Sequence, residues 1–120
     1  MTKQTQNQEQ KQEFNYFEFL KFQVLKAYFT SLFKGEKTNE ITFTVKHLDS
    51  SKNAWFYKNG AFKFISWHST FDENGRELIE IKIKDINLDA IAKSKEGKEF
   101  KIFNSLDISK AVKSAHKALA

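Results

Sequence analysis

The chain has 120 residues, the size of one domain, and its 40% hydrophobic content with 13 phenylalanines is enough for a core. It has no cysteine, which excludes disulfides, thiolate metal sites and cysteine nucleophiles. The net charge of +5 permits an acidic partner, either nucleic acid or an acidic protein.

The lysine excess has two explanations. Only one of the 20 basic residues, Arg76, is an arginine, and proline is absent. Codon usage in an AT-rich genome produces the same bias, so the charge is either functional or compositional. Arginine makes the commonest specific contact with DNA bases, whereas lysine acts as a point charge on phosphate. The composition therefore argues against sequence-specific reading of DNA.

Residues 1–13 are rich in glutamine and contain no apolar run, which speaks against a signal peptide and predicts a disordered tail. No apolar run reaches the ~18 residues of a membrane helix. Small secreted domains usually depend on disulfides, so the lack of cysteine favours a cytoplasmic location. We expect this tail to be followed by a single domain over residues 14–120.

A helix is predicted over residues 14–34 and should end at Gly35. One stripe with a period of 3.6 residues carries Phe14, Phe17, Leu20, Val24, Leu25, Tyr28 and Leu32. A second side of this helix carries Phe19, Phe22, Phe29 and Phe33. Either the C-terminal helix covers this second side, or it meets a protein partner or a second copy of the chain in a homodimer.

A strand is predicted over residues 41–46, because Ile41, Phe43 and Val45 alternate with polar residues. A loop over residues 49–53 follows. The pairs Asn59-Gly60 and Asn74-Gly75 then separate aromatic and β-branched runs. Asn-Gly favours a two-residue hairpin turn, which needs positive φ at both positions. We therefore expect two successive hairpins.

The register that these turns impose divides the side chains between two faces of the sheet. The inner face would carry Trp55, Tyr57, Phe62, Phe64, Ile79, Ile81 and Ile83. The outer face would mix large apolar groups with ammonium groups: Phe56, Lys58, Lys63, Ile65, Trp67, Lys82 and Lys84. This register also turns Ser66, His68 and Thr70 inward, a misfit that a β-bulge near Ser66 or His68 would explain.

Rings between lysines suit single-stranded nucleic acid, because bases stack on the rings while lysines neutralise phosphates. The alternative is an ordinary outer face, either covered by the C-terminal helix or half exposed with lysine stems lying over the rings.

The last third is predicted to hold a helical turn over residues 87–93, a turn over 95–98, an edge strand over 99–103 and a helix over 106–119, capped by Ser105 or Asp107. A second basic region consists of Lys93, Lys95, Lys98, Lys101, Lys110, Lys113 and Lys117. Such lysines are also typical of a solvated helix face.

The expected fold is α+β: a long N-terminal helix, an antiparallel meander of four to five strands and a C-terminal helix.

The sequence contains no catalytic constellation. The histidines His47, His68 and His116 lack the spacing of metal ligands, and no phosphate-binding loop or nucleophile motif occurs. We therefore expect a protein that is not an enzyme and that has no metal and no cofactor.

The leading hypothesis is a small non-catalytic protein that binds single-stranded or structured nucleic acid through the outer sheet face. The alternative is a protein-binding inhibitor or adaptor of the phage or mobile-element type, anti-defence or anti-CRISPR-like, that blocks a nucleic-acid-processing protein. The lysines favour the first hypothesis, and the second aromatic side of helix 14–34 favours the other. No membrane is expected as a partner.

Overall fold

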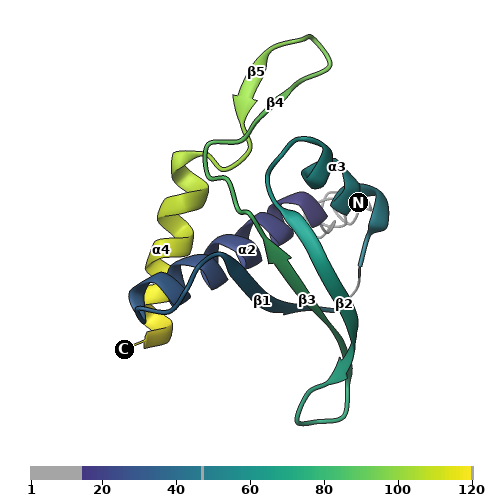
Figure 1. Cartoon of the computed structure of the whole chain (residues 1–120), viewed down its shortest axis with the longest axis vertical. Helices are drawn as coiled ribbons and strands as arrows, with labels where there is room; N and C mark the ends of the chain where they lie inside the picture. The colour runs from purple at the N-terminus through teal and green to yellow at the C-terminus, as the bar shows by residue number, and fades with distance from the viewer. Residues whose placement is uncertain (1–14, 47, 120) are drawn as a thin grey trace, which may run out of the picture.

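The computed structural model describes residues 15–46 and 48–119. The predicted tail over residues 1–13, Phe14 and His47 lie outside this part. The described residues form three helices and five strands, in the order α2 (Tyr16–Phe33), β1 (Glu40–Val45), α3 (Ser50–Lys58), β2 (Lys63–Phe71), β3 (Glu77–Lys84), β4 (Ile91–Lys93), β5 (Glu99–Lys101) and α4 (Ser105–Leu119). The predicted α+β class is confirmed, with an N-terminal helix, antiparallel strands and a C-terminal helix (Figure 1).

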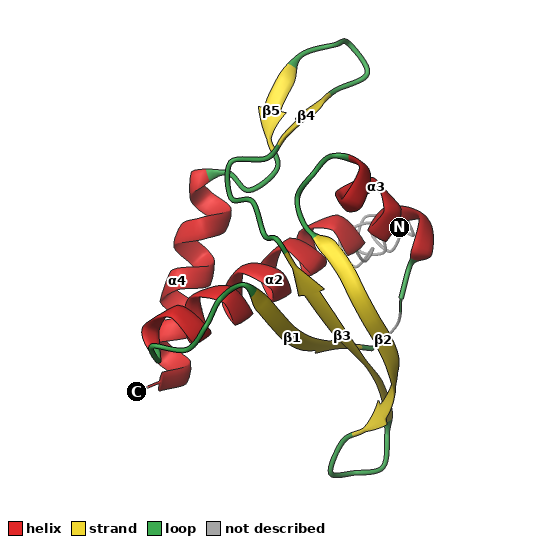
Figure 2. Cartoon of the chain, in the orientation of Figure 1, coloured by secondary structure: helices red, strands yellow, loops and turns green. Residues whose placement is uncertain are grey.

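The main sheet has three antiparallel strands in the spatial order β1-β3-β2. Helix α2 crosses one face of this sheet, and α4 packs against α2 (Figure 2). Strands β4 and β5 pair with each other in a hairpin that projects from the rest of the described chain (Figure 1). The core lies between α2 and the sheet, and its fully buried side chains include Leu20, Val24, Leu25, Ile81 and Ile83.

Helix α2 begins and ends within two residues of its predicted limits. The Asn15 side chain accepts the Glu18 N–H at 3.2 Å and caps the first turn. At the other end, Gly35 has a φ of 76° and stops the helix as predicted. Leu20, Val24 and Leu25 of the predicted stripe are buried, whereas Leu32 at its end is exposed.

Strand β1 follows the predicted alternation. Its even-numbered residues are exposed, and its odd-numbered residues face the isoleucines of β3 across the ladder. The pairs on this inner face are Ile41 with Ile83, Phe43 with Ile81, and Val45 with Ile79.

The first of the two predicted hairpins is wrong, because residues 50–58 form helix α3 and Asn59-Gly60 ends this helix. The Ala61 N–H donates to the Phe56 carbonyl at 3.0 Å, and the Gly60 N–H donates to the Tyr57 carbonyl at 3.1 Å. These two hydrogen bonds form a Schellman motif, which needs a residue at positive φ, and Gly60 has a φ of 74°. The Asn-Gly pair therefore serves a helix end here and not a hairpin turn.

The start of α3 lies where a loop was predicted over residues 49–53. The Asp49 carboxylate accepts the backbone N–H of Lys52 at 3.2 Å and the hydroxyl of Ser51 at 3.0 Å. The first of these satisfies a donor that the helix itself leaves unpaired. The same hydrogen bonds, that of the Lys52 N–H above all, lower the pKa of the Asp49 carboxyl.

The second hairpin forms, but its loop is one residue longer than predicted. The Asp72 N–H donates to the Arg76 carbonyl and the Gly75 N–H donates to the Asp72 carbonyl, each at 3.0 Å. This leaves three residues in the loop, a type I turn followed by a glycine at positive φ. The Asp72 carboxylate holds the longer loop by accepting the N–H groups of Asn74 and Arg76, each at 2.9 Å.

The longer loop shifts the pairing of β2 with β3 by one residue. Trp67 faces Ile81, whereas the predicted partner was Lys82. A shift of one residue turns every side chain of a strand to the other face. Ser66 and His68 therefore point outward and the predicted misfit disappears. The predicted bulge is present at Phe64 to Ser66, where the register changes again.

The C-terminal third differs from its prediction in one element. Residues 91–93, predicted to lie in a helical turn, form strand β4, which pairs with β5 through the predicted turn at residues 95–98. Helix α4 is capped by Asn104, whose side chain accepts the Asp107 N–H at 2.9 Å, while the Asp107 carboxylate accepts the Asn104 N–H at 3.2 Å. The predicted cap, Ser105 or Asp107, is therefore wrong: Asn104 is the N-cap, Ser105 is the first helical residue, and Asp107 completes a reciprocal capping box from the third helical position.

We expect Gly60→Ala to lower the free energy of unfolding by about 1–2 kcal/mol, because an alanine at positive φ strains the backbone. Apart from the glycine and its chain neighbours, no atom of the described residues lies within 4 Å of the position that the new Cβ would take, so no clash adds to this strain. Gly60→Asn is the control and should cost less, since asparagine tolerates this conformation. Urea unfolding measures both, and equal losses would contradict the assigned helix end.

Candidate functional site

The predicted outer face does not form as one surface. Phe56 is fully buried in α3 and stacks on Phe62, with ring centroids 5.4 Å apart. Lys58 is the last residue of α3, and Trp67 lies on the inner face of the sheet opposite Ile81. Ile65 is exposed at the bulge. Both rings are lost from the outer face because one predicted strand is a helix and the other has a shifted register.

Three of the four lysines of the predicted face, Lys63, Lys82 and Lys84, remain together on the outer face of β2 and β3. Lys84 pairs with Lys63 across the ladder, and Lys82 pairs with Ser66. Acidic groups lie among them: Lys63 forms an ion pair with Asp85 at 3.7 Å. The His68 Nε2 lies 3.1 Å from Glu80. This face is of mixed charge and carries no phenylalanine, tyrosine or tryptophan from its three described strands.

The second predicted basic region divides into two groups, and all seven of its lysines are exposed. Lys93, Lys95, Lys98 and Lys101 lie on the β4–β5 hairpin, and Lys110, Lys113 and Lys117 lie on α4. Lys101 forms an ion pair with Asp89 at 3.5 Å. A binding role for the two groups stays a prediction.

The second aromatic side of α2 is covered in part by α4, and Phe33 at its end is 38% exposed. Phe19 and Phe29 pack against the core, and Phe33 stacks on His116 of α4 with ring centroids 4.4 Å apart. Phe22 is half buried and borders a small cavity beside Asp107. The contact with α4 agrees in part with the first predicted arrangement, and both the protein partner and the homodimer stay untested predictions.

A different group of rings is exposed. Tyr57 of α3 is 56% exposed, and Trp67 and Phe71 of β2 are 54% and 67% exposed. Trp67 and Phe71 share the inner face of the sheet, since the residues between them alternate along β2. We call Tyr57, Trp67 and Phe71 the aromatic surface. Tyr57 and Trp67 both line a cavity of about 370 Å³ between α3 and β2, together with Leu48, Ser50, Asn53, Ala54 and Phe64.

Sequence reasoning missed this surface because it placed Tyr57 in the core and Trp67 on the other face. It gave no role to Phe71. The inward misfit of Ser66, His68 and Thr70 was the signal of the register error, and shifting the pairing by one residue removes it.

A second cavity, of about 420 Å³, lies between α2, α3 and the β4–β5 hairpin, and we call it the hairpin groove. Its lining combines aromatic and aliphatic side chains with lysines: Phe17, Glu18, Lys21, Trp55, Phe56, Lys93, Ser94, Lys95, Phe100 and Ile102. Sequence reasoning did not find it, because the groove depends on α3 being a helix.

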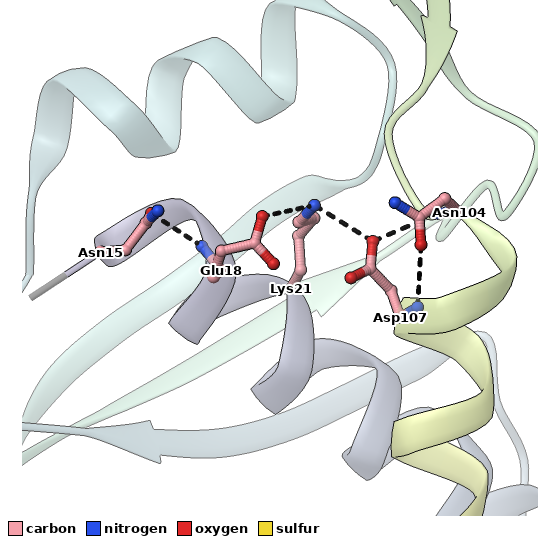
Figure 3. Close-up of polar contacts among 5 residues, drawn as sticks. All are labelled: Asn15, Glu18, Lys21, Asn104 and Asp107. Carbon is pink, nitrogen blue, oxygen red and sulfur yellow. Dashed lines mark hydrogen bonds and ion pairs between the residues drawn. The ribbon is translucent and has the colours of Figure 1, made fainter. Parts of the chain in front are cut away.

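Two polar contacts fix the helices that border these cavities. The buried Tyr16 hydroxyl donates to the Asn53 side-chain oxygen at 2.6 Å and joins α2 to α3. Burial raises the pKa of the Tyr16 hydroxyl. The Lys21 ammonium donates to Asp107 at 3.1 Å and also lies 3.1 Å from Glu18, joining α2 to α4 (Figure 3). Burial acts to lower the pKa of Lys21, but the two carboxylates outweigh it and raise that pKa.

Among the described residues, no group of three or more histidine, aspartate or glutamate side chains is arranged to hold a metal ion. In the same residues, no helix has the length and apolar character needed to cross a membrane. No family model, curated protein or solved structure matches this chain. Function is therefore inferred from the geometry of the surfaces.

We expect Lys21→Met to lower the free energy of unfolding at pH 7 by about 1.5–3 kcal/mol, the range for hydrogen bonds to charged groups. Because the folded pKa of Lys21 is raised, its contribution is complete below the ordinary value of 10.5 and is lost as the pH rises through the folded value. The difference between wild type and variant should therefore shrink above pH 10.5.

Urea unfolding at a series of pH values measures this difference. Lys26→Met is the control, because Lys26 lies on the same helix and forms no ion pair within the described residues. It should change stability at pH 7 by less than about 0.5 kcal/mol. An unchanged difference for Lys21→Met across the alkaline range would contradict the assigned role of its ammonium group.

Proposed function

We propose that this protein is a small non-catalytic binding protein that docks on another protein by accepting an extended segment of it along the free edge of β2. The observation that carries the proposal is the aromatic surface, whose three rings are more than half exposed beside an edge strand. Exposed clusters of large apolar side chains are typical of interaction sites, and tyrosine and tryptophan are enriched among residues that dominate binding energy.

The edge of β2 has unpaired backbone groups to offer. Within the described strands, β2 pairs with β3 alone. Asp72 and Arg76 form a hydrogen-bonded pair at the end of the ladder. Because such pairs alternate along antiparallel strands, the N–H and C=O groups of Trp67, Ser69 and Phe71 point away from β3. A segment added there would find donors and acceptors at three successive outward positions.

This part of the edge lacks the usual protection against strand addition. Natural edge strands are often protected by lysine, proline or a bulge. In β2 the bulge and Lys63 lie at the first part of the strand, and residues 66–71 contain neither lysine nor proline. The open part of the edge therefore coincides with the exposed rings.

The same geometry describes the segment that would bind. Side chains two residues apart on an added strand share a face, so apolar residues at alternate positions would lie beside Trp67 and Phe71. The cavity of about 370 Å³ next to Trp67 could take one of them. A protein that binds in this way acts by holding a segment of its partner, so that the segment is no longer available for other contacts. This mode of action is typical of an inhibitor or an adaptor.

The outer sheet face supports nucleic-acid binding less well. Its lysines alternate with acidic groups, and its described strands offer no phenylalanine, tyrosine or tryptophan on which a base could stack. The lysines and rings that do lie together are those of the hairpin groove.

Selection of a phage-displayed library of random peptides against the whole protein should yield peptides with apolar residues at alternate positions. Trp67→Ser should weaken their binding by about 30-fold, the loss of about 2 kcal/mol that defines a dominant interface residue. Ser69→Pro should weaken it by about tenfold or more, because it removes an outward N–H.

Ser69→Ala is the matched control. Both substitutions remove the hydroxyl that donates to Glu77 at 2.8 Å, but only proline removes the N–H. Thermal unfolding checks that each variant keeps its fold. Selected peptides that bind Ser69→Pro as well as Ser69→Ala would overturn the strand-addition proposal.

A further inference from the structure

The hairpin groove has an aromatic wall of fixed geometry. Phe17 and Trp55 meet edge to face with ring centroids 5.1 Å apart, and Phe17 lies 5.6 Å from Phe56. Trp55 and Phe56 are also edge to face at 5.2 Å. Three mutually packed rings from two helices leave little freedom to the wall that they form.

The opposite wall carries a ring that has no such packing. Phe100 pairs with the buried Ala92 across the β4–β5 ladder, so it lies on the side of the hairpin that faces the groove. It is 44% exposed, and it makes no ring contact with any other described residue. A flat group in the groove would therefore have Phe100 on one side and the wall of Phe17 and Trp55 on the other.

Unneutralised cations line the same groove. Lys93 and Lys95 are exposed and form no ion pair within the described part of the chain. Lys21, by contrast, is bound to Glu18 and Asp107. The free positive charge at the groove therefore comes from Lys93 and Lys95 of the hairpin, the element that also carries Phe100.

We propose that the hairpin groove binds single-stranded nucleic acid, with one base held between Phe100 and Trp55 and the adjoining phosphates at Lys93 and Lys95. Aromatic rings stack with every base, and lysine suits phosphate as a point charge. An acidic peptide would neutralise the charge of the lysines, but it has no flat bases that would stack between the two facing walls of rings. This site and the β2 edge are different surfaces with different ligands, so either proposal can fail alone.

The test uses the full chain with Trp67→Phe, which leaves Trp55 as the only tryptophan of the two in the sequence. A thymidine oligonucleotide of about ten nucleotides is added at low salt, and Trp55 fluorescence is followed. We expect quenching with saturation. An abasic oligomer of equal length and charge should bind more weakly and quench little. Absence of quenching, or equal binding of the abasic oligomer, would overturn the proposal.

Two pairs of variants separate stacking from charge. Phe100→Ala should weaken oligonucleotide binding by roughly 5- to 150-fold, the range for one stacked base. Phe100→Leu should weaken binding by a similar factor, because leucine keeps the apolar volume on the hairpin but removes the ring. Replacing Lys93 and Lys95 together by glutamine should reduce the slope of log affinity against log salt by about 1.4.

The matched control replaces Lys82 and Lys84 by glutamine, which removes the same charge from the outer sheet face. It should leave both the quenching and the salt slope unchanged. Equal effects of the two double variants would show binding by general charge and overturn the assigned site. Binding of a polyglutamate peptide with no binding of the oligonucleotide would overturn it in favour of an acidic protein partner.

Discussion

Helix α2 is the element to which every other layer is attached, because it must bury more than one side at once. Its aliphatic side packs on the sheet, and its second aromatic side packs on α4. The buried Tyr16 and the partly buried Lys21 of this helix need partners, since an unpaired buried donor is costly. Tyr16 finds Asn53 in α3, and Lys21 finds Asp107 in the capping box of α4. These contacts place the two later helices relative to the first, and Figure 3 shows the contact of Lys21 with Asp107.

The short helix α3 then decides where the exposed rings lie. Trp55 and Phe56 face α2 and line the hairpin groove, while Tyr57 borders the cavity beside β2. In a strand, Trp55 and Tyr57 would have shared one face with alternate neighbours. The helical geometry separates them instead, and the aromatic run that resembles one half of a hairpin contributes to two different surfaces.

The long periodic elements could be predicted from the sequence, and the short ones could not. Helices α2 and α4, strand β1 and the isoleucine strand β3 each repeat one pattern over enough residues to exclude the alternative. The pair Asn59-Gly60 could not distinguish a helix end from a hairpin turn, because both require a residue at positive φ. The residue that distinguishes the two is Asp49, which lies nine residues before Lys58. Its side chain caps the N-terminus of a helix, and this role requires that a helix follows.

The aromatic surface could not be predicted because it depends on the register of β2 against β3. One extra residue in the loop held by Asp72 moves Trp67 from one face of the sheet to the other. Side-chain hydrogen bonds of this kind set loop length and leave no hydrophobic pattern in the sequence. The lysines were found correctly as exposed groups, but their aromatic neighbours were not, since neighbours across the fold follow from packing.

Because α3 supplies a wall to both cavities, the two surfaces are mechanically joined through nine residues of one helix. Any occupant that moves or stiffens α3 at one cavity alters the shape that the other presents. Thermodynamic linkage then makes the effect mutual: a first ligand that changes the affinity for a second by some factor has its own affinity changed by that same factor.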